Sequence, residues 1–528
     1  MDRSVVLIAE ELSEATVTAL GPDIEVRYCA GADREALLAA LPGADAVLVR
    51  SATRMDAEAI AAGTRLKVIG RAGVGLDNVD VAAATRAGVM VVNAPTANVV
   101  SAAELTVGLL LAVARNIPQA GAALKEGRWQ RSRYTGVELA GKTLGIIGLG
   151  RIGSLVARRM EAFGMRLLAY DPYVRPEHAA RSGVRVTGLD ELLAEADFLT
   201  VHLPRTSGTA GLIGFDALHK VKPGVRLVNA ARGGIVDETE LYAALKEGRI
   251  AGAAVDVFAT EPCTDSPLFE LDNVIVTPHL GAGTAEAQER AGTAVAASVR
   301  QALSGRFVPE AANLAVGAVD GELDPWLVLT EELGRLFTAT ADGLPRRLRV
   351  RVDGEITVHD TAALELAALK GALDGVAAGA VSYVNAPLIA REHGLGTELI
   401  NGADGGAHHS LVTLSGVLPS GEEVSVAGTL TGPGSGHRLV EVCGFTLDLP
   451  LTGTTLFFRA PDAPGLVGAV TEALDRTPLN ALRIAHGSPD GNEVLLALSV
   501  SGPVAPEVLD AAAAGIHATR RWSLEQSA

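Results

Sequence analysis

The segment at residues 142–160, KTLGIIGLGRIGSLVARRM, constrains the fold more than any other part of the sequence. Gly148, Gly150 and Gly153 form a G-x-G-x-x-G pattern between an apolar run and a helix-like run. Such glycines allow a tight turn, let the backbone approach a pyrophosphate and let the helix pack closely on the strand. The helix N-terminus then offers N–H groups and a partial positive charge to the phosphates. The pattern predicts a Rossmann-type dinucleotide site, against the alternative of an ordinary glycine-rich turn.

The next β-like run, RLLAYD, ends in Asp171. A carboxylate at this point suits the ribose diol of NAD and repels the 2′-phosphate of NADP. The sequence therefore predicts NAD as the cofactor.

The glycine pattern lies far from the N-terminus, and β-like runs alternate with helix-like runs on both sides of it. This alternation over residues 4–92 and again from residue 144 predicts two α/β domains built from parallel βαβ units. Residues 318–452 form a mixed region with its own strands. The last segment, residues 454–524, follows the order β-α-β-β-α-β, which is typical of a ferredoxin-like domain.

Charge and composition exclude several classes of protein. The net charge of −17 argues against a nucleic-acid partner, and any anion site must be built locally from arginines. The three cysteines are far apart and form no disulfide framework or metal-ligand spacing, so we predict no metal site. The N-terminal residues lack the apolar run of a signal peptide, and no apolar run reaches the length of a membrane span. We expect a soluble cytoplasmic protein with no membrane partner.

Arg232, Glu261 and His279 each follow a β-like run, in NAARGG, VDVFATEP and TPHLGA. Strand ends line the ligand crevice of an open α/β sheet. Hydride transfer from a C–OH carbon needs a base for the hydroxyl proton, which suits histidine, and a carboxylate that stabilises the imidazolium. An arginine can bind a carboxylate through two parallel hydrogen bonds. Singly, these residues also fit a surface salt bridge, a helix-start carboxylate and a strand-end histidine.

The motifs RAGVGLDNVD, NAPTANVVSAAEL, GLGRIG, NAARGG and TPHLGAGTAEAQ resemble those of the D-isomer-specific 2-hydroxyacid dehydrogenases. The resemblance covers nearly the whole chain and is strongest to the long branch with C-terminal regulatory domains. It implies a Rossmann-type NAD-binding domain, residues 98–284, inserted in a flavodoxin-like substrate domain, residues 1–97 and 285–316. An intervening α+β regulatory domain, residues 317–452, and a ferredoxin-like ACT domain, residues 453–528, follow.

The resemblance also implies roles for individual residues. His279 is the acid/base, Glu261 pairs with it, and Arg232 binds the substrate carboxylate. The implied cofactor residues are Gly148, Gly150, Arg151, Ile152, Gly153, Asp171, Ala230, Ala231, Asp256 and Gly281. The implied substrate residues are Arg50, Ser51, Arg54, Gly73, Val74, Gly75 and Asn98. The family commonly has a serine where this chain has Gly283, which removes a hydroxyl near the cofactor.

By this resemblance the chain oxidises 3-phosphoglycerate to 3-phosphohydroxypyruvate with NAD, in the first step of L-serine biosynthesis. L-serine is the implied effector, at Asp462 and Asn480, although Asp462 also suits a helix cap. A homo-oligomer, a tetramer, is the implied assembly. The alternatives are another D-2-hydroxyacid dehydrogenase, such as a glycerate/hydroxypyruvate reductase, and a non-catalytic NAD-sensing protein that resembles transcriptional corepressors. Arg50, Arg54 and the two regulatory-type domains favour the phosphorylated substrate.

Overall fold

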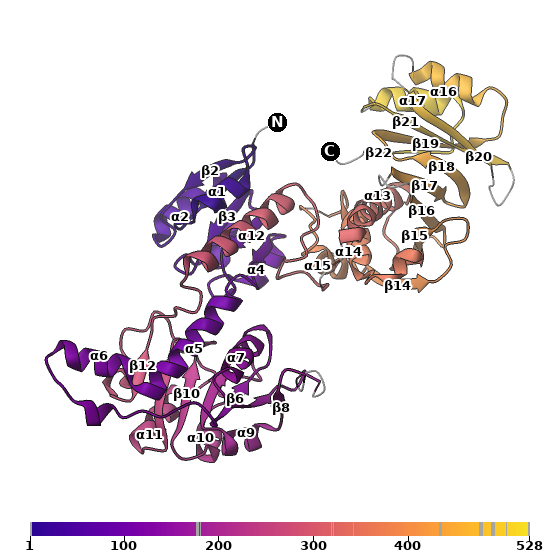
Figure 1. Cartoon of the computed structure of the whole chain (residues 1–528). Helices are drawn as coiled ribbons and strands as arrows, with labels where there is room; N and C mark the ends of the chain where they lie inside the picture. Colours follow the sequence, from indigo (N-terminus) through magenta and orange to yellow (C-terminus); the bar gives the residue numbers. More distant parts are fainter. Residues whose placement is uncertain are drawn as a thin grey trace.

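A computed structural model describes the chain as four sheets with their covering helices (Figure 1). It covers residues 3–175, 179, 181–317, 319, 321–341, 343–377, 379–431, 436–474, 479–486, 492–502 and 504–525. The side chains at residues 479–482, 486 and 525 lie outside this description.

The first sheet is parallel, with the strand order β2-β1-β3-β4-β5, which is the flavodoxin-like order. Its central strands are continuous apolar runs because helices cover both faces. Its strands are β1 (Val5–Ile8), β2 (Glu25–Tyr28), β3 (Ala46–Val49), β4 (Val68–Arg71) and β5 (Met90–Asn93). Its helices are α1 (Glu14–Leu20), α2 (Arg34–Ala40), α3 (Ala57–Ala62) and α4 (Val81–Arg86).

The second sheet is parallel, with the order β12-β11-β10-β9-β6-β7-β8, and contains the Rossmann arrangement. The strand order reverses between β6 and β9, so ligand-binding loops are expected beyond the carboxyl ends of these strands. Its strands are β6 (Thr143–Ile147), β7 (Arg166–Tyr170), β8 (Val184–Val186), β9 (Phe198–Val201), β10 (Val225–Asn229), β11 (Ile250–Val255) and β12 (Val274–Val276). Its helices include α5 (Val99–Arg115), α6 (Ile117–Lys125), α7 (Arg151–Glu161), α9 (Leu189–Glu195), α10 (Phe215–Lys220) and α11 (Glu238–Lys246).

Two long helices connect these sheets and explain why the glycine turn comes late in the chain. Leu110 and Val113 of α5 lie in the core around β6, whereas Val295 and Val299 of α12 (Ala285–Leu303) lie in the core of the first sheet. The chain therefore leaves the first sheet along α5, builds the second sheet and returns along α12 (Figure 1). The predicted fold class is confirmed, while the domain boundaries at residues 97, 284, 316 and 452 remain predictions.

The third sheet has the order β14-β13-β15-β16-β17-β18 and is antiparallel except between β13 and β14. Helices α13 and α14 cross in backbone contact, since a Cβ at Gly371 would lie 2.1 Å from Glu331 O. Its strands are β13 (Arg347–Gly354), β14 (Gly396–Gly402), β15 (Ser410–Val417), β16 (Glu423–Thr431), β17 (Gly436–Val442) and β18 (Phe445–Pro450). Its helices are α13 (Asp324–Thr340), α14 (Ala362–Leu373) and α15 (Ala386–Glu392).

The fourth sheet is antiparallel with the order β20-β21-β19-β22, which is the ferredoxin-like arrangement predicted from the sequence. Alternate residues of its strands are buried on opposite faces. Phe458 packs in the core beneath the two helices, whereas Phe457 joins the core of the third sheet. The elements are β19 (Thr454–Pro461), α16 (Leu466–Leu474), β20 (Leu479–His486), β21 (Glu493–Val500), α17 (Pro506–Gly515) and β22 (Arg520–Glu525).

Within the described part of the chain, no single helix is long and apolar enough to cross a membrane. Helices α5 and α6 pass this test of length and composition only as a pair, and they are bent by 64° at the break between them.

Candidate active site

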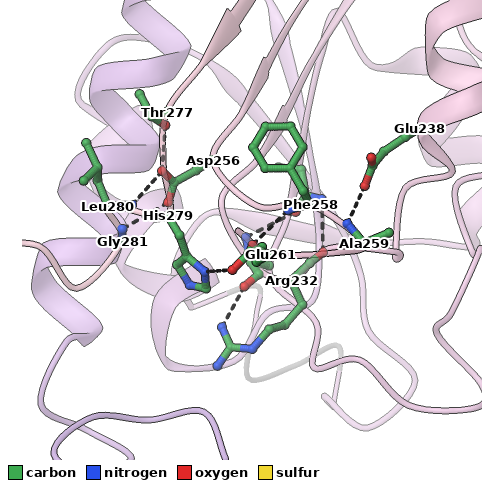
Figure 2. A network of polar contacts seen from close by, with 12 residues as sticks. Arg232, Glu238, Asp256, Phe258, Ala259, Glu261, Thr277, His279, Leu280 and Gly281 are labelled. Carbon is green, nitrogen blue, oxygen red and sulfur yellow. Dashed lines mark hydrogen bonds and ion pairs between the residues drawn. The ribbon is translucent and has the colours of Figure 1, made fainter. Parts of the chain in front are cut away.

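His279 and Glu261 form a hydrogen-bonded pair beyond the carboxyl ends of β11 and β12 (Figure 2). His279 Nδ1 lies 2.6 Å from Glu261 Oε2, and Glu261 Oε1 accepts the Phe258 N–H at 2.9 Å. Both carboxylate oxygens are engaged, so the carboxylate orientation is fixed. The exposed fractions of the two side chains are 42% and 34%, so the pair is open to a ligand. Because Nδ1 faces Glu261, Nε2 is the nitrogen free to meet a substrate.

Glu261 is held as a carboxylate. Burial opposes its ionisation, but the hydrogen bonds from His279 and the Phe258 N–H outweigh burial and lower the pKa of Glu261. A negative charge in contact with the imidazole stabilises the imidazolium that forms when a histidine accepts a proton. The pair therefore has the geometry and charge of a general base with its orienting carboxylate.

Asp256 holds the turn that carries His279 (Figure 2). Its Oδ1 accepts the Thr277 hydroxyl at 2.6 Å and the Leu280 N–H at 2.7 Å, and its Oδ2 accepts the Gly281 N–H at 3.0 Å. His279 has a φ of 54°, a left-handed conformation that non-glycine residues rarely adopt. The buried carboxylate, whose pKa is raised by that burial, compensates for this backbone strain. Asp256 thus acts on His279 through the turn, and its predicted place beside the nicotinamide remains a prediction.

Arg232 follows β10 and extends toward the first sheet. A Cβ at Gly75 would lie 3.1 Å from Arg232 Nη2, so the guanidinium lies against the loop at residues 73–75. Asn229, which the sequence analysis missed, supports the turn: its Nδ2 donates to Arg232 O at 3.2 Å and its Oδ1 accepts the Ala231 N–H at 3.2 Å. The proposed carboxylate-binding residue and the proposed substrate loop are therefore brought together.

Arg71, at the end of β4, is a second functional residue that the sequence analysis missed. Burial lowers its pKa, and the nearby Arg232 and Arg50 lower it further, whereas Asp77 and Glu10 oppose this effect. Its Nε is buried and has no hydrogen-bond partner among the described residues. Its guanidinium lies against the loop at residues 73–75, because a Cβ at Gly73 would lie 1.5 Å from Nη1. The available signal was its place at a strand end within RAGVG.

The remaining predicted substrate residues are distributed unevenly. Arg50 directly follows β3 and lies near Arg71. Ser51 is exposed in the same loop, and Asn98 occupies the residue before α5. Val74 O accepts the Asn93 side-chain amide at 2.5 Å. Arg54 differs from these, since its side chain is 81% exposed and its Nε lies 4.0 Å from Asp56, away from the arginines at the strand ends.

The glycine turn fits a dinucleotide pyrophosphate. Gly148 has a φ of 99°, and a Cβ there would lie 2.8 Å from His202 O. A Cβ at Gly153 would lie 2.1 Å from Gly148 O, whereas a Cβ at Gly150 would meet nothing within 4 Å. The first and third glycines are thus required by the turn and by packing, and the second leaves open space at the N-terminus of α7.

Three further predicted cofactor residues adjoin this turn. Arg151 is the first residue of α7, followed by Ile152. The Asp171 carboxylate accepts the Leu149 N–H and the Tyr173 N–H, each at 2.9 Å, which places a negative charge beside the turn. This arrangement fits the ribose of NAD.

The described residues contain no group of three or more His, Cys, Asp or Glu side chains that could hold a metal ion. Cys29, Cys263 and Cys443 are free. Burial raises the pKa of Cys29 and Cys443, so both are thiols rather than thiolates at neutral pH.

Comparison with known proteins agrees with this geometry. Residues 107–281 match the NAD-binding domain of D-isomer specific 2-hydroxyacid dehydrogenases, and residues 322–443 match the D-3-phosphoglycerate dehydrogenase intervening domain. A D-3-phosphoglycerate dehydrogenase of Mycobacterium leprae is 52% identical over 95% of this chain and 96% of its own length. One from Archaeoglobus fulgidus is 40% identical over 96% of this chain and 97% of its own.

Solved structures match the first part of the chain. The TT0316 protein of Thermus thermophilus has a TM-score of 0.54 and 34% identity, and the match covers 58% of this chain and 99% of that one. A D-lactate dehydrogenase of Aquifex aeolicus, complexed with NAD and lactic acid, has a TM-score of 0.51 and 30% identity over 57% of this chain and 96% of that one.

The inserted Rossmann fold, the glycine turn and the histidine–glutamate pair define an NAD-dependent dehydrogenase. With relatives this similar over nearly the full length, the chain belongs to the D-3-phosphoglycerate dehydrogenase family.

We expect Asp256→Asn to lower kcat about tenfold or more. The amide has one acceptor oxygen, so its NH2 group must face an N–H donor of the 277–281 turn and His279 loses its position. Steady-state kinetics with tryptophan-fluorescence titration of NADH will separate this effect from cofactor loss. Unchanged kcat would show that the turn holds His279 without the carboxylate.

His202 gives a pH-dependent contribution to stability. Burial lowers the pKa of its imidazole to about 4, and Thr200 Oγ1 lies 3.0 Å from its Nε2. The unfolded chain binds this proton at a higher pH than the folded chain does. The contribution of His202 to the free energy of unfolding is therefore fully present above the pKa of the unfolded state, and it is lost as the pH falls toward 4. This amounts to up to about 2 kcal/mol between pH 7 and pH 5. Calorimetry would follow the unfolding transition that NADH shifts to higher temperature. Between pH 7 and pH 5, His202→Gln should lose less stability in this transition than the unaltered chain does. An equal loss in both proteins would contradict the prediction.

Proposed function

We propose that this chain oxidises 3-phospho-D-glycerate to 3-phosphohydroxypyruvate with NAD, as the first step of L-serine biosynthesis. The observation that carries the proposal is the position of three arginines at the strand ends: Arg71 and Arg232 both lie against the loop at residues 73–75, and Arg50 directly follows the neighbouring strand β3. Three guanidinium groups that repel one another are best satisfied by an anionic ligand with more than one charged group. A phosphorylated 2-hydroxy acid carries a carboxylate at one end and a phosphate at the other. The relatives named D-3-phosphoglycerate dehydrogenase support the same substrate.

In the proposed reaction, Arg232 binds the substrate carboxylate, helped by the backbone N–H groups of residues 73–75. Arg50 and Arg71 bind the phosphate. His279 Nε2 accepts the proton of the C2 hydroxyl as the hydride leaves the same carbon, and Glu261 stabilises the resulting imidazolium. NAD, when bound, accepts the hydride at its nicotinamide.

We assign the cofactor to the turn of Gly148, Gly150 and Gly153, with Arg151 and Ile152 at the pyrophosphate and Asp171 at the adenosine ribose. Ala230, Ala231, Asp256 and Gly281 are assigned to the nicotinamide side. The positions of these residues beyond β6, β7, β10, β11 and β12 support the assignment, because those strand ends share one edge of the sheet. Ser51, Arg54 and Asn98 remain proposed substrate contacts.

We propose that the fourth sheet is an ACT domain that binds L-serine. Its ferredoxin-like strand order supports this assignment. Asp462 lies in the loop before α16, where its N–H donates to Asn492 O at 3.0 Å. Gly465 follows with a φ of 91°, next to the helix N-terminus that could receive the effector carboxylate. The Asn480 side chain lies outside the described residues, although its backbone belongs to β20.

We also propose a cytoplasmic homotetramer. Large apolar side chains remain exposed on and just after α6, including Ile117, Leu124 and Trp129, and they support a subunit contact there. A glycerate/hydroxypyruvate reductase and an NAD-sensing protein without turnover are the alternatives that the kinetic test below separates.

NADH formation at 340 nm, with purified protein and NAD, tests the substrate. We expect turnover of 3-phosphoglycerate and much weaker turnover of D-glycerate, which lacks the phosphate. Arg50→Met and Arg71→Met should each raise the KM for 3-phosphoglycerate about 10- to 100-fold, the effect of losing a hydrogen bond to a charged group. Arg27→Met is the matched control and should leave the KM unchanged, because this arginine of β2 is exposed and pairs with Glu25. Equal turnover of both acids would overturn the substrate, and no turnover of either would favour a sensor.

Addition of L-serine tests the regulatory proposal. L-serine should lower the rate with 3-phosphoglycerate, while D-serine should not. Asp462→Ala should abolish inhibition because the amino group of the effector loses its carboxylate partner. Glu507→Ala changes an exposed residue on α17, a helix that covers the same sheet. This variant should still be inhibited by L-serine. Equal sensitivity of both variants would remove Asp462 from the effector site.

A further inference from the structure

We infer that Glu10 and Asn78 are positioning residues that clamp the loop at residues 50–53 and thereby align Arg50 for the phosphate of the substrate. The inference rests on the proposed function, because it assumes that this loop faces the phosphate. It concerns the loop between β3 and α3.

Glu10 lies two residues beyond β1. Its carboxylate binds one side of the loop by accepting hydrogen bonds from the backbone N–H groups of the loop. Its Oε1 accepts the Arg50 N–H at 2.8 Å and the Thr53 N–H at 2.9 Å, and its Oε2 accepts the Ala52 N–H at 3.2 Å. Hydrogen bonds to an ionised carboxylate are stronger than neutral ones. Three such bonds to one carboxylate fix the path of the loop over four residues.

Asn78 binds the other side of the same loop through its carbonyl groups. Its Nδ2 donates to Arg50 O at 2.7 Å and to Thr53 O at 2.6 Å. Its own backbone O accepts the Met55 N–H at 2.8 Å, just beyond the loop. The loop ends, Arg50 and Thr53, are therefore each held at the N–H by Glu10 and at the C=O by Asn78.

The clamp links the loop to both neighbouring strands of the sheet. Glu10 comes from the end of β1, and Asn78 lies in the segment that follows β4, the strand that ends in Arg71. These hydrogen bonds therefore contribute to the relative positions of Arg50 and Arg71. Glu10 also lies close enough to Arg71 to raise its pKa against the effect of burial.

Position and charge can be separated because the two clamp residues differ in charge. Glu10→Ala removes all three carboxylate bonds and also a negative charge near the arginines, a charge loss that by itself favours an anion, whereas Asn78→Ala leaves the charge unchanged. Both changes release the same loop. A weaker affinity for the phosphorylated substrate in both variants therefore identifies loop position as the cause.

The experiment measures kcat and KM for 3-phosphoglycerate and D-glycerate in Glu10→Ala, Asn78→Ala and the double variant. We expect the KM for 3-phosphoglycerate to rise about tenfold in each single variant, with a smaller change in kcat and in the KM for D-glycerate. The double variant should differ little from the worse single variant, because residues that act on one loop are not additive.

Asp45→Ala is the matched control at the opposite end of β3. The Asp45 carboxylate accepts the Val5 N–H at 2.9 Å and pairs with Arg65, so its loss removes a similar carboxylate–backbone bond far from the loop. We expect a lower melting temperature with an unchanged KM. The melting temperatures of all variants show whether each is folded.

The outcomes are distinct for the clamp and for the proposed function. Preference of the unaltered chain for 3-phosphoglycerate, with an unchanged KM in Asn78→Ala, overturns the clamp alone. A KM rise in the double variant equal to the product of the single effects also overturns it, because two independent sites are then involved. Equal turnover of the two acids by the unaltered chain overturns the proposed substrate and, with it, the phosphate role of the loop.

Discussion

Every group at the active site depends on one constraint of parallel sheets. Helices cover both faces of such a sheet, so polar groups can meet a ligand only beyond the strand ends. The residues follow this rule in both sheets: they come after β1, β3 and β4 in the first sheet and after β6, β7, β10, β11 and β12 in the second. Helices α5 and α12 connect the two sheets, and Ser101 Oγ lies 2.8 Å from Thr284 Oγ1 where the two connections meet. The site therefore combines two edges that belong to different stretches of sequence.

The arginine cluster at the candidate site is opposite in sign to the net charge of the chain. The protein carries a net charge of −17, yet Arg50, Arg71 and Arg232 gather at the strand ends. An arginine that is partly buried beside two others is unfavourable without an anion, and the lowered pKa of Arg71 records this. The arginine cluster thus lowers the stability of the folded chain locally, as groups that bind a charged ligand commonly do at functional sites.

The residues proposed to do the chemistry could be predicted because their type and their position agree. His279, Glu261 and Arg232 each combine a reactive side chain with a strand end, and the three glycines have separate geometric reasons that the structure makes visible. Asn229, Glu10 and Asn78 were missed because they act through backbone hydrogen bonds with residues near or distant in sequence, which no local pattern records. Arg71 was missed because the sequence pattern indicates only the last residue of a buried strand at this position. Arg54 shares a loop with Arg50, but its side chain is exposed to solvent and lies near Asp56.

The third sheet contacts the first sheet through the segment at residues 383–385 and through the segment that follows α12. Tyr383 packs in the core of the third sheet and donates its hydroxyl to Glu331 Oε2 at 2.9 Å, whereas Val384 packs in the core of the first sheet. Asn385 lies directly against Gly88, where a Cβ would come within 2.6 Å of its amide nitrogen. The fourth sheet in turn shares the core of the third through Phe457. The C-terminal sheets therefore contact the sheet whose loops carry Arg50 and Arg71, and this contact is made through buried side chains.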